Sequence, residues 1–352
     1  MTQAAATPST RPRSRRRRLL FAMVPVTGLL LLGELVCRVT RHPFYFGSFR
    51  DKRTDLMARN YPAERDPMLG YVPKPGFASR DNHWRTLVSI DADGMRRNGR
   101  TPPPGGGLVA AVGDSFTFGD QVDDDATWPA QLEVALDRPV KNGGVFGYSL
   151  TQSVLRAEAM LDRFDVAALV VSFIPDDLTR CEYSKRYTPV PWFDLDGDGI
   201  VLRGVPIDPS APPDSTKRWK DTLGYSALVD TVLANTVRDW WCENEKQVPV
   251  SHLLGRGPEI GKYLVERIAA RCRACGTRLL LLLQGDVPTE QACGVLHHAE
   301  ALGVETLDLA TRFVAEKRRD PSLEDRYFAG HMTREGNRWV ADAVAERLRA
   351  AK

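Results

Sequence analysis

A serine and a histidine, far apart in the chain, carry the clearest signals for chemistry. Ser115 follows a Gly-Asp pair directly after the apolar run 108–112, which is typical of a buried parallel strand. Open α/β sheets bind ligands at the carboxyl ends of their strands, so this hydroxyl stands in a suitable place. A serine hydroxyl becomes a strong nucleophile when an imidazole accepts its proton. Of the 6 histidines, His331 has the clearest setting, after the last predicted strand and before the helical pattern 336–351.

Two further segments follow predicted strands and bear groups that could stabilise an oxyanion. Gly147 belongs to a glycine-rich stretch after the strand 140–142, where the backbone can come close and offer an N–H group. Asp176 and Asp177 follow the strand 168–174. The carboxyl ends of parallel strands share one edge of a sheet, so we expect Ser115, Gly147 and Asp176 to lie together, with Ser115 also offering its backbone N–H.

Strands that alternate with helices predict the fold class. The pattern favours a three-layer α/β/α domain with a five-stranded parallel sheet, of the flavodoxin-like kind. The predicted strands are 108–112, 140–142, 168–174, 279–283 and 304–307. The predicted helices are 128–136, 153–163, 260–274, 289–301 and 336–351.

An insertion of some 75 residues, about 181–257, interrupts this alternation. Asp194, Asp196 and Asp198 have the spacing of the first ligands in a calcium loop, but Val205 stands where such a loop needs glutamate. Apolar residues alternate on both sides of these aspartates, which favours a β-hairpin over 192–202. The stretch 225–241 is predicted as an amphipathic helix, and the whole insertion as a cap or partner-binding surface.

The N-terminal region predicts a membrane anchor. Six arginines in the tail 1–18 precede the apolar segment 19–39, which approaches the roughly 20 residues that a bilayer needs. The arginines place the amino terminus in the cytoplasm and the rest of the chain outside. A cleaved signal peptide is the alternative, but no small-x-small cleavage site follows the segment. We expect a stalk and flap over 40–105 and a catalytic domain over 106–352.

Charge and cysteine content limit the classes of function. The net charge of +3 is concentrated in the arginine tail, so no general surface for nucleic acid is expected. The 6 cysteines are scattered. Cys272 and Cys275 have metal or redox spacing, but no second pair completes a zinc site, and we expect no metal and no cofactor. One disulfide could form in an oxidising compartment, with a pairing that the sequence leaves open.

Together, these motifs resemble the SGNH (GDSL) hydrolase family. The resemblance covers roughly residues 65–350 and extends to the segments 70–76 and 93–96, which look like the lead-in of membrane-anchored bacterial members. It implies that Ser115 is the nucleophile, that Gly147 and the Ser115 N–H hold the oxyanion, and that His331 is the general base.

The chain departs from the family pattern at two places. The family's third motif ends in Asn-Asp, whereas this chain has Asp176 and Asp177, and an ionised Asp176 cannot donate to an oxyanion, although a protonated one can. The triad acid normally stands two or three residues before the histidine, where this chain has phenylalanine and alanine. Asp325 is our candidate acid, with Glu324 or a backbone carbonyl as alternatives.

The resemblance implies a membrane-anchored, extracytoplasmic serine esterase or O-acyl transferase. It would form an acyl-Ser115 intermediate and act on acyl esters, such as those of envelope glycans. The alternative is a weakened or inactive relative that binds glycan or serves as a partner in envelope polysaccharide assembly. A single-pass protein of the inner membrane, with its catalytic domain in the periplasm, fits both hypotheses.

Overall fold

The computed structural model describes residues 15–41, 45–50, 60–197, 199–208, 218–242 and 247–350. The chain forms two compact units, and the insertion is divided between them. Unit 1 comprises Met1–Thr54 and Ser215–Glu243, and unit 2 comprises Asp55–Asp214 and Asn244–Lys352. The limits of tail, anchor, stalk and catalytic domain given above stay predictions.

A five-stranded parallel sheet forms the centre of unit 2, as the sequence predicted. Its strand order is β14-β13-β7-β5-β6, so β5, which ends just before Ser115, lies inside the sheet. Apolar runs without polar alternation suit strands that are buried on both faces. The strands are β5 Leu108–Val112, β6 Val140–Asn142, β7 Val166–Phe173, β13 Arg278–Leu283 and β14 Glu305–Asp308.

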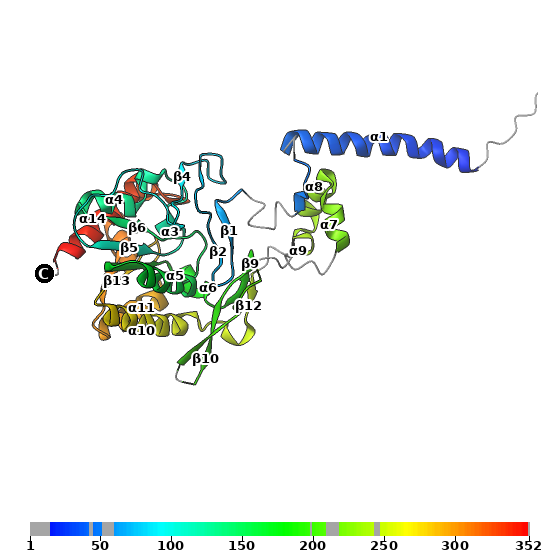
Figure 1. Ribbon diagram of the computed structural model, residues 1–352. Coiled ribbons are helices and arrows are strands. Elements are labelled where there is room, and N and C mark those ends of the chain that lie inside the picture. The colour runs from blue at the N-terminus through cyan, green and yellow to red at the C-terminus, as the bar shows by residue number, and fades with distance from the viewer. Residues whose placement is uncertain are drawn as a thin grey trace, which may run out of the picture. The chain divides into compact units, whose positions relative to one another are not determined.

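Helices cover both faces of this sheet and complete the three layers. Figure 1 shows α10 and α11 on one side of the sheet and α4 and α14 on the other. Side chains of each strand alternate between the two cores: Ala110 and Val112 of β5 join the first, whereas Val109 and Ala111 join the second. The helices of unit 2 are α3 Ser115–Phe118, α4 Trp128–Leu136, α5 Leu150–Arg163, α6 Pro175–Arg180, α10 Gly257–Cys275, α11 Glu290–Ala301, α12 Leu309–Lys317, α13 Leu323–Tyr327 and α14 Arg334–Ala350, with 3₁₀ turns at Asp124–Ala126 and Ser251–Leu253.

Short antiparallel strands surround the sheet. The predicted hairpin in the insertion is confirmed: β10 Trp192–Asp196 pairs with β11 Gly199–Arg203, and Asp198 lies outside the described residues. Asp194 hydrogen-bonds His252 at 2.7 Å. The other short strands are β1 Ala63–Asp66, β2 Gly70–Pro73, β3 Ala78–Ser79, β4 Val88–Ser89, β8 Tyr183–Arg186, β9 Thr188–Pro189, β12 Val248–Pro249, β15 Phe328–Ala329 and β16 His331–Met332.

Unit 1 contains a long N-terminal helix together with helices of the insertion. Helix α1 (Arg15–Arg41) contains the apolar segment Phe21–Arg41, with a mean hydropathy of 1.7 and none of its most apolar window buried. That length and composition suit either a membrane-spanning helix or a signal sequence. The insertion contributes α7 (Arg218–Gly224), α8 (Ala227–Thr236) and α9 (Arg238–Trp241). The single helix predicted over 225–241 is therefore wrong, because the chain breaks between α8 and α9 at Val237, whose φ is −137°.

No disulfide links any two of the six cysteines, all of which lie among the described residues. Cys272 is buried in α10 while Cys275 is exposed near its end, so the helix turns the two thiols of this pair toward different surroundings. The disulfide that the sequence left open is not formed in this structure.

Candidate active site

Ser115 is the first residue of a short helix that begins immediately after β5. Asp114 caps this helix, since its Oδ1 accepts the Phe116 N–H at 2.9 Å, and Gly119 ends it with a φ of 77°. The first N–H groups of a helix have no acceptor inside it, so the Ser115 N–H is available to a ligand. The sequence thus folds into a tight strand-to-helix turn that presents both the hydroxyl and the backbone N–H of one residue.

The structure brings His331 to this hydroxyl across 216 positions of sequence. Its Nε2 lies 2.9 Å from the Ser115 Oγ, which is hydrogen-bonding distance. His331 is on β16, a strand of a short hairpin that precedes the last helix. Burial lowers the pKa of His331 below its usual 6.5, while the charge of Asp114 opposes that effect and Arg180 adds to it. A neutral imidazole at pH 7 is the form that can accept the serine proton.

The other ring nitrogen of His331 faces an amide instead of a carboxylate. Gln121 Nε2 lies 3.3 Å from His331 Nδ1, and Gln121 Oε1 accepts the His331 backbone N–H at 3.3 Å. An amide N–H that donates to Nδ1 leaves the ring proton on Nε2, where it points at the Ser115 oxygen. That tautomer cannot accept the serine proton, because the accepting nitrogen must be Nε2. Gln121 therefore occupies the place of a triad acid and orients the ring without favouring the active tautomer.

Changing this amide to a carboxylate is expected to raise activity. In Gln121→Glu both carboxylate oxygens accept, one from the His331 backbone N–H and one from Nδ1–H, so the proton moves to Nδ1 and Nε2 becomes the base. A wrong tautomer costs on the order of 10⁴-fold in a triad enzyme, so we expect kcat/KM for an aryl acetate to rise by at least about tenfold. The acid limb of the pH profile should also move to higher pH, because the new charge stabilises the imidazolium.

The matched control is Gln121→Met, which keeps the length of the side chain and offers no acceptor. Its kcat/KM should lie well below that of Gln121→Glu, because methionine offers Nδ1–H no acceptor. If Gln121→Glu is no more active than Gln121→Met, the position does not control the tautomer of His331.

A second carboxyl, Asp120, lies buried beside the same imidazole. Its Oδ2 is 3.8 Å from His331 Nε2, and its Oδ1 is buried without a hydrogen-bond partner. Burial, with the charge of Asp114 as the next cause, raises the pKa of Asp120 to about 8. At pH 7 this carboxyl is therefore largely protonated and neutral next to the Ser115–His331 pair.

This buried carboxyl makes stability depend on pH. Unfolded Asp120 loses its proton near pH 4 and folded Asp120 only near pH 8, so the unfolded state binds fewer protons in between and stability falls as pH rises. In Asp120→Asn this loss should disappear, and the variant should gain up to about 5 kcal/mol on the wild type between pH 4 and pH 8, at about 1.4 kcal/mol per pKa unit. Urea unfolding at both pH values measures the difference. Equal slopes for the two proteins would show that Asp120 is ionised in the folded state.

Arg180 joins the segments that surround Ser115. Its Nη1 donates to Asp114 Oδ2 at 3.3 Å, to the Tyr148 carbonyl at 3.1 Å and to Asp177 Oδ1 at 2.5 Å. Asp114 and Asp177 are fully buried, so two carboxyls share one guanidinium. Burial and the charge of Asp114 raise the pKa of Asp177 well above its usual range. The guanidinium holds the ends of β5 and β7 and the glycine-rich segment together.

The structure brings some of the other predicted site residues to this place and leaves others outside it. Gly147 has a φ of 72°, and its carbonyl accepts Arg186 Nη1 at 2.6 Å. Among the loop and turn hydrogen bonds of the described residues, none uses the Gly147 N–H, so it stays available. Asp176 points outward with 78% of its side chain exposed and pairs with Arg180 at 3.9 Å.

The predicted triad acids lie on α13, away from the imidazole. Asp325 is exposed, and no hydrogen bond or ion pair in the described structure joins it to His331. Glu324 pairs with Lys317 at 2.6 Å. The roles of Asp325 and Asp176 stay predictions for which this geometry supplies no contact, whereas Gln121 and Asp120 have the positions near His331.

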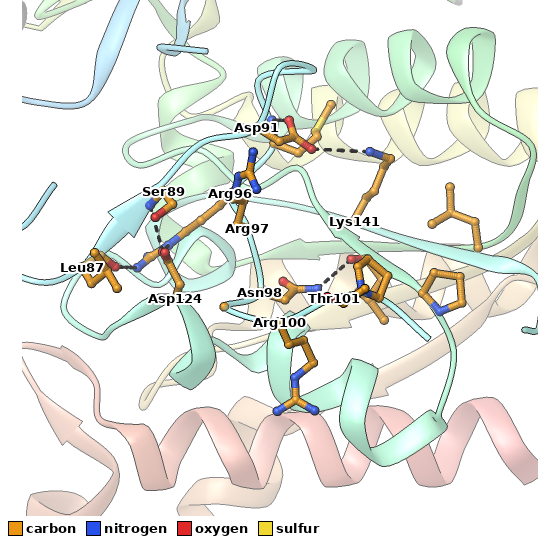
Figure 2. Close-up of a pocket in the computed structure, with 16 residues that line it drawn as sticks. Leu87, Ser89, Asp91, Arg96, Arg97, Asn98, Arg100, Thr101, Asp124 and Lys141 are labelled. Atoms are coloured by element: carbon orange, nitrogen blue, oxygen red, sulfur yellow. Dashed lines mark hydrogen bonds and ion pairs between the residues drawn. The ribbon is translucent and has the colours of Figure 1, made fainter. Parts of the chain in front are cut away.

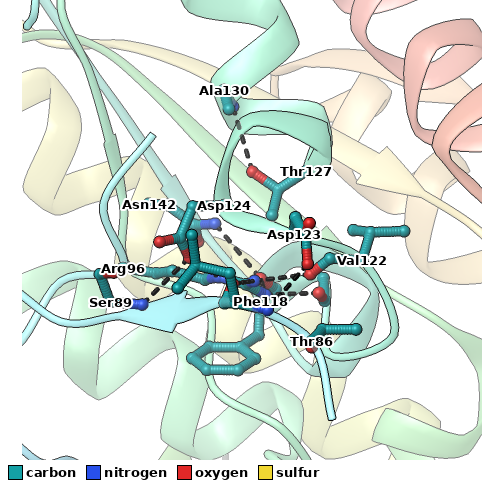
Figure 3. Close-up of polar contacts among 12 residues, drawn as sticks. Thr86, Ser89, Arg96, Phe118, Val122, Asp123, Asp124, Thr127, Ala130 and Asn142 are labelled. Atoms are coloured by element: carbon teal, nitrogen blue, oxygen red, sulfur yellow. Dashed lines mark hydrogen bonds and ion pairs between the residues drawn. The ribbon is translucent and has the colours of Figure 1, made fainter. Parts of the chain in front are cut away.

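Arg96 fixes the loop that carries Asp120 and Gln121. Its guanidinium is fully buried, lies 3.0 Å from Asp124 Oδ1 and donates to four backbone carbonyls (Figure 3). The carbonyls belong to Leu87, Phe118, Gly119 and Val122. Three of these carbonyls, those of Phe118, Gly119 and Val122, lie soon after Ser115 in the sequence. Arg96 therefore holds the turn from the nucleophile to Gln121 in one conformation.

A cavity of about 620 Å³ has Arg96 in its lining (Figure 2). Arg97, Arg100 and Lys141 line it, but Ser115 and His331 do not. Lys141 pairs there with Asp91 at 3.5 Å. The candidate active site is the Ser115–His331 pair at the sheet edge, and this cavity beside β6 is separate from it.

Comparison with known proteins gives similarity in fold at low sequence identity. No protein-family model and no curated protein sequence matches the chain. A GDSL-like lipase from Bacteroides thetaiotaomicron shares 11% identity over 72% of this chain and 95% of its own, with a TM-score of 0.38. A catalytic mutant of an acetylxylan esterase from Geobacillus stearothermophilus shares 12% over 70% and 96%, with a TM-score of 0.38. A psychrotrophic esterase from Pseudoalteromonas sp. shares 10% over 70% and 98%, with a TM-score of 0.36.

One of these neighbours is described as a GDSL-like lipase and the other two as esterases. At such identities no residue role passes from them to this chain. The roles of Ser115, His331 and their neighbours are argued from the distances and burial given above.

Proposed function

We propose that the chain is a serine esterase or O-acyl transferase that works through an acyl-Ser115 intermediate. The observation that carries the proposal is the 2.9 Å contact between Ser115 Oγ and His331 Nε2 at the carboxyl end of a parallel sheet. In the tautomer that carries its proton on Nδ1, His331 accepts the serine proton through Nε2 as Oγ attacks the acyl carbonyl, and the N–H groups of Ser115 and Gly147 receive the oxyanion. The imidazolium then gives its proton to the leaving alkoxide. Water or a sugar hydroxyl removes the acyl group in the second half of the reaction, again with His331 as base.

The environment of the pair supports this assignment. The lowered pKa of His331 keeps the imidazole neutral above pH 6.5, so kcat/KM should be flat there and fall only in more acidic solution. Arg180 contacts Asp114 and the Tyr148 carbonyl, and so holds the Ser115 turn and the glycine-rich segment together.

We further propose that the protein is anchored in the inner membrane by α1 and acts outside the cytoplasm on acyl esters of envelope glycans. The arginine-rich tail and the apolar Phe21–Arg41 segment support this topology. In spheroplasts, exposed Cys275 should react with a membrane-impermeant maleimide, and Cys275→Ser should remove that label. Labelling only after lysis would contradict an extracytoplasmic hydrolase unit.

The substrate class has its own experiment. The full chain in detergent or nanodiscs is incubated with an O-acetylated polysaccharide, and released acetate is measured with and without a deacetylated oligosaccharide as acceptor. An esterase releases acetate in both reactions, whereas a transferase moves acetyl groups to the acceptor sugar. No loss of polysaccharide acetyl groups, together with turnover of an aryl acetate, would exclude these glycans as substrates.

A second candidate function follows from Gln121. An amide at Nδ1 in place of a carboxylate suits a protein that keeps a binding cleft and has lost most turnover. Such a protein would bind acylated glycan as a partner of envelope polysaccharide assembly. Glycan binding that is unchanged in Ser115→Ala, without turnover of any acetyl ester by the wild type, would favour this candidate.

A further inference from the structure

The insertion helices of unit 1 expose an unusual number of large apolar side chains. Trp219 and Trp240 lie side by side, with ring centroids 5.7 Å apart, and are 51% and 43% exposed. Lys220 Nζ lies 4.1 Å from the centre of the Trp240 ring. The other exposed apolar residues of these helices and the links between them are Leu223, Tyr225, Val232 and Val237. A water-soluble surface rarely collects so many large apolar groups on three short helices.

The carboxylate of Glu34, near the end of α1, contacts the start of α8. Glu34 accepts hydrogen bonds from Ser226 Oγ at 2.7 Å and from the N–H groups of Ala227 at 3.0 Å and Leu228 at 2.9 Å. Arg38 donates to the same carboxylate at 2.6 Å. Glu34 thus caps the amino end of α8 from a different helix, and it satisfies orphan N–H groups that α8 would otherwise leave open.

The position of Glu34 along α1 sets the depth of α8. Glu34 lies inside the apolar Phe21–Arg41 segment, 7 residues before its end, which corresponds to about 10 Å at 1.5 Å per residue. A hydrocarbon core of about 30 Å that begins at the arginine tail reaches the neighbourhood of Glu34. A carboxylate at that depth is costly unless it is paired and hydrogen-bonded. The partners that satisfy it come from α8, so α8 begins at the same level.

The last turn of α1 extends this contact. Arg41 Nη1 binds Asp230 Oδ2 of α8 at 2.8 Å, and Asp230 Oδ1 accepts the indole N–H of buried Trp241 at 2.8 Å. Arg38 Nη2 donates to the Tyr225 carbonyl at 2.6 Å. Glu34, Arg38 and Arg41 of α1 therefore have hydrogen-bond partners on the insertion segment. The exposed aromatic and aliphatic side chains of α7–α9 form part of the outer surface of unit 1.

We propose that α7, α8 and α9 form an interfacial foot that lies in the outer headgroup region of the bilayer that α1 spans. Trp and Tyr favour this region because their rings are apolar and their N–H or O–H groups are polar. The foot rests on the proposed anchoring, since the level of Glu34 in the membrane defines the level of α8. It commits the exposed surface of α7–α9 to lipid, and not to a protein partner. The chain passes between the two units three times, so the foot ties unit 2 to the membrane by the insertion as well as by α1.

The test uses the full chain reconstituted in nanodiscs of phosphatidylethanolamine and phosphatidylglycerol. A benzophenone amino acid replaces one residue at a time, and lipid adducts are counted by mass spectrometry after irradiation. The foot is probed at Trp219 and Val232, and α1 at Leu30, which is 56% exposed. Val287 is the matched control, since it is 61% exposed in a loop of unit 2.

We expect lipid adducts at positions 219, 232 and 30, each at least about tenfold above position 287. Adducts at 30 with only background at 219 and 232 would overturn the foot and leave the anchoring intact. Crosslinks at 219 and 232 to protein instead of lipid would overturn it in favour of a partner surface. Background at position 30 would contradict the anchoring itself, and the foot with it.

Discussion

Ser115→Ala is expected to lower kcat/KM for an aryl acetate by at least about 10³-fold, because no other group takes the place of the attacking oxygen. The hydroxyl contacts His331 and, at 3.4 Å, Asp114. After its loss, water at this loop can take its place as the hydrogen-bond partner of both groups. The free energy of unfolding should therefore stay within about 1 kcal/mol of the wild type. Initial rates and urea unfolding on the same preparations measure both quantities.

Ser153→Ala is the control for this substitution. Ser153 is also a buried serine, but it lies in α5 and its Oγ has no hydrogen-bond partner. Its removal should leave the rate unchanged. A Ser115→Ala protein that is as active as Ser153→Ala would show that Ser115 is not the nucleophile.

Arg96→Met is expected to destabilise unit 2 by about 3–5 kcal/mol, because it leaves buried Asp124 without its cation and four carbonyls without a donor. Methionine fills the volume of the aliphatic part but donates nothing. Activity should fall as well in the molecules that remain folded, since the loop from Phe118 to Val122 carries Asp120 and Gln121 to His331.

The neighbouring Arg97 provides the control for charge and composition. Arg97 is exposed and lines the cavity beside β6, so Arg97→Met should change the free energy of unfolding by no more than about 0.5 kcal/mol. Urea unfolding monitored by tryptophan fluorescence compares the two variants. A similar loss of stability in both would mean that the buried network of Arg96 contributes little.

The fold could be predicted well from periodicity, because the three inner strands β5, β7 and β13 are largely buried and read as apolar runs. The strands β5 and β6 and the helix α4 have the bounds that the sequence predicted. Other elements differ by one to three residues at their ends, where capping decides the boundary: Ser149 and Gln152 form a capping box that starts α5 at Leu150, earlier than its apolar pattern.

The residues around the nucleophile were only partly predictable. Ser115, Gly147 and His331 stand in motifs, whereas Gln121 and Asp120 approach His331 only because the turn after α3 and the hairpin β15–β16 fold toward each other. Their position directly after the Ser115 motif was the available signal. The family pattern, which places the acid shortly before the histidine, favoured Asp325 instead. Distance along the sequence gave no reason to prefer Gln121 or Asp120 over it.

Long-range polar contacts could not be predicted from the sequence for the same reason. Glu34 and Ser226 are separated by 192 positions, and neither residue type indicates the other. Arg180 gave a local signal, since it follows Asp177 by three positions in α6, but its contacts with Asp114 and Tyr148 depend on the packing of three strand ends.

Reaction with a fluorophosphonate tests the central claim most directly, because only an activated serine attacks this phosphorus. The full chain is incubated with the reagent and digested, and the modified peptide is identified by mass spectrometry. We predict a single adduct on Ser115 that is absent in Ser115→Ala and lost in His331→Ala, whose Oγ has no base. No adduct on Ser115 in the folded wild type, or an equally fast adduct in His331→Ala, would contradict the account.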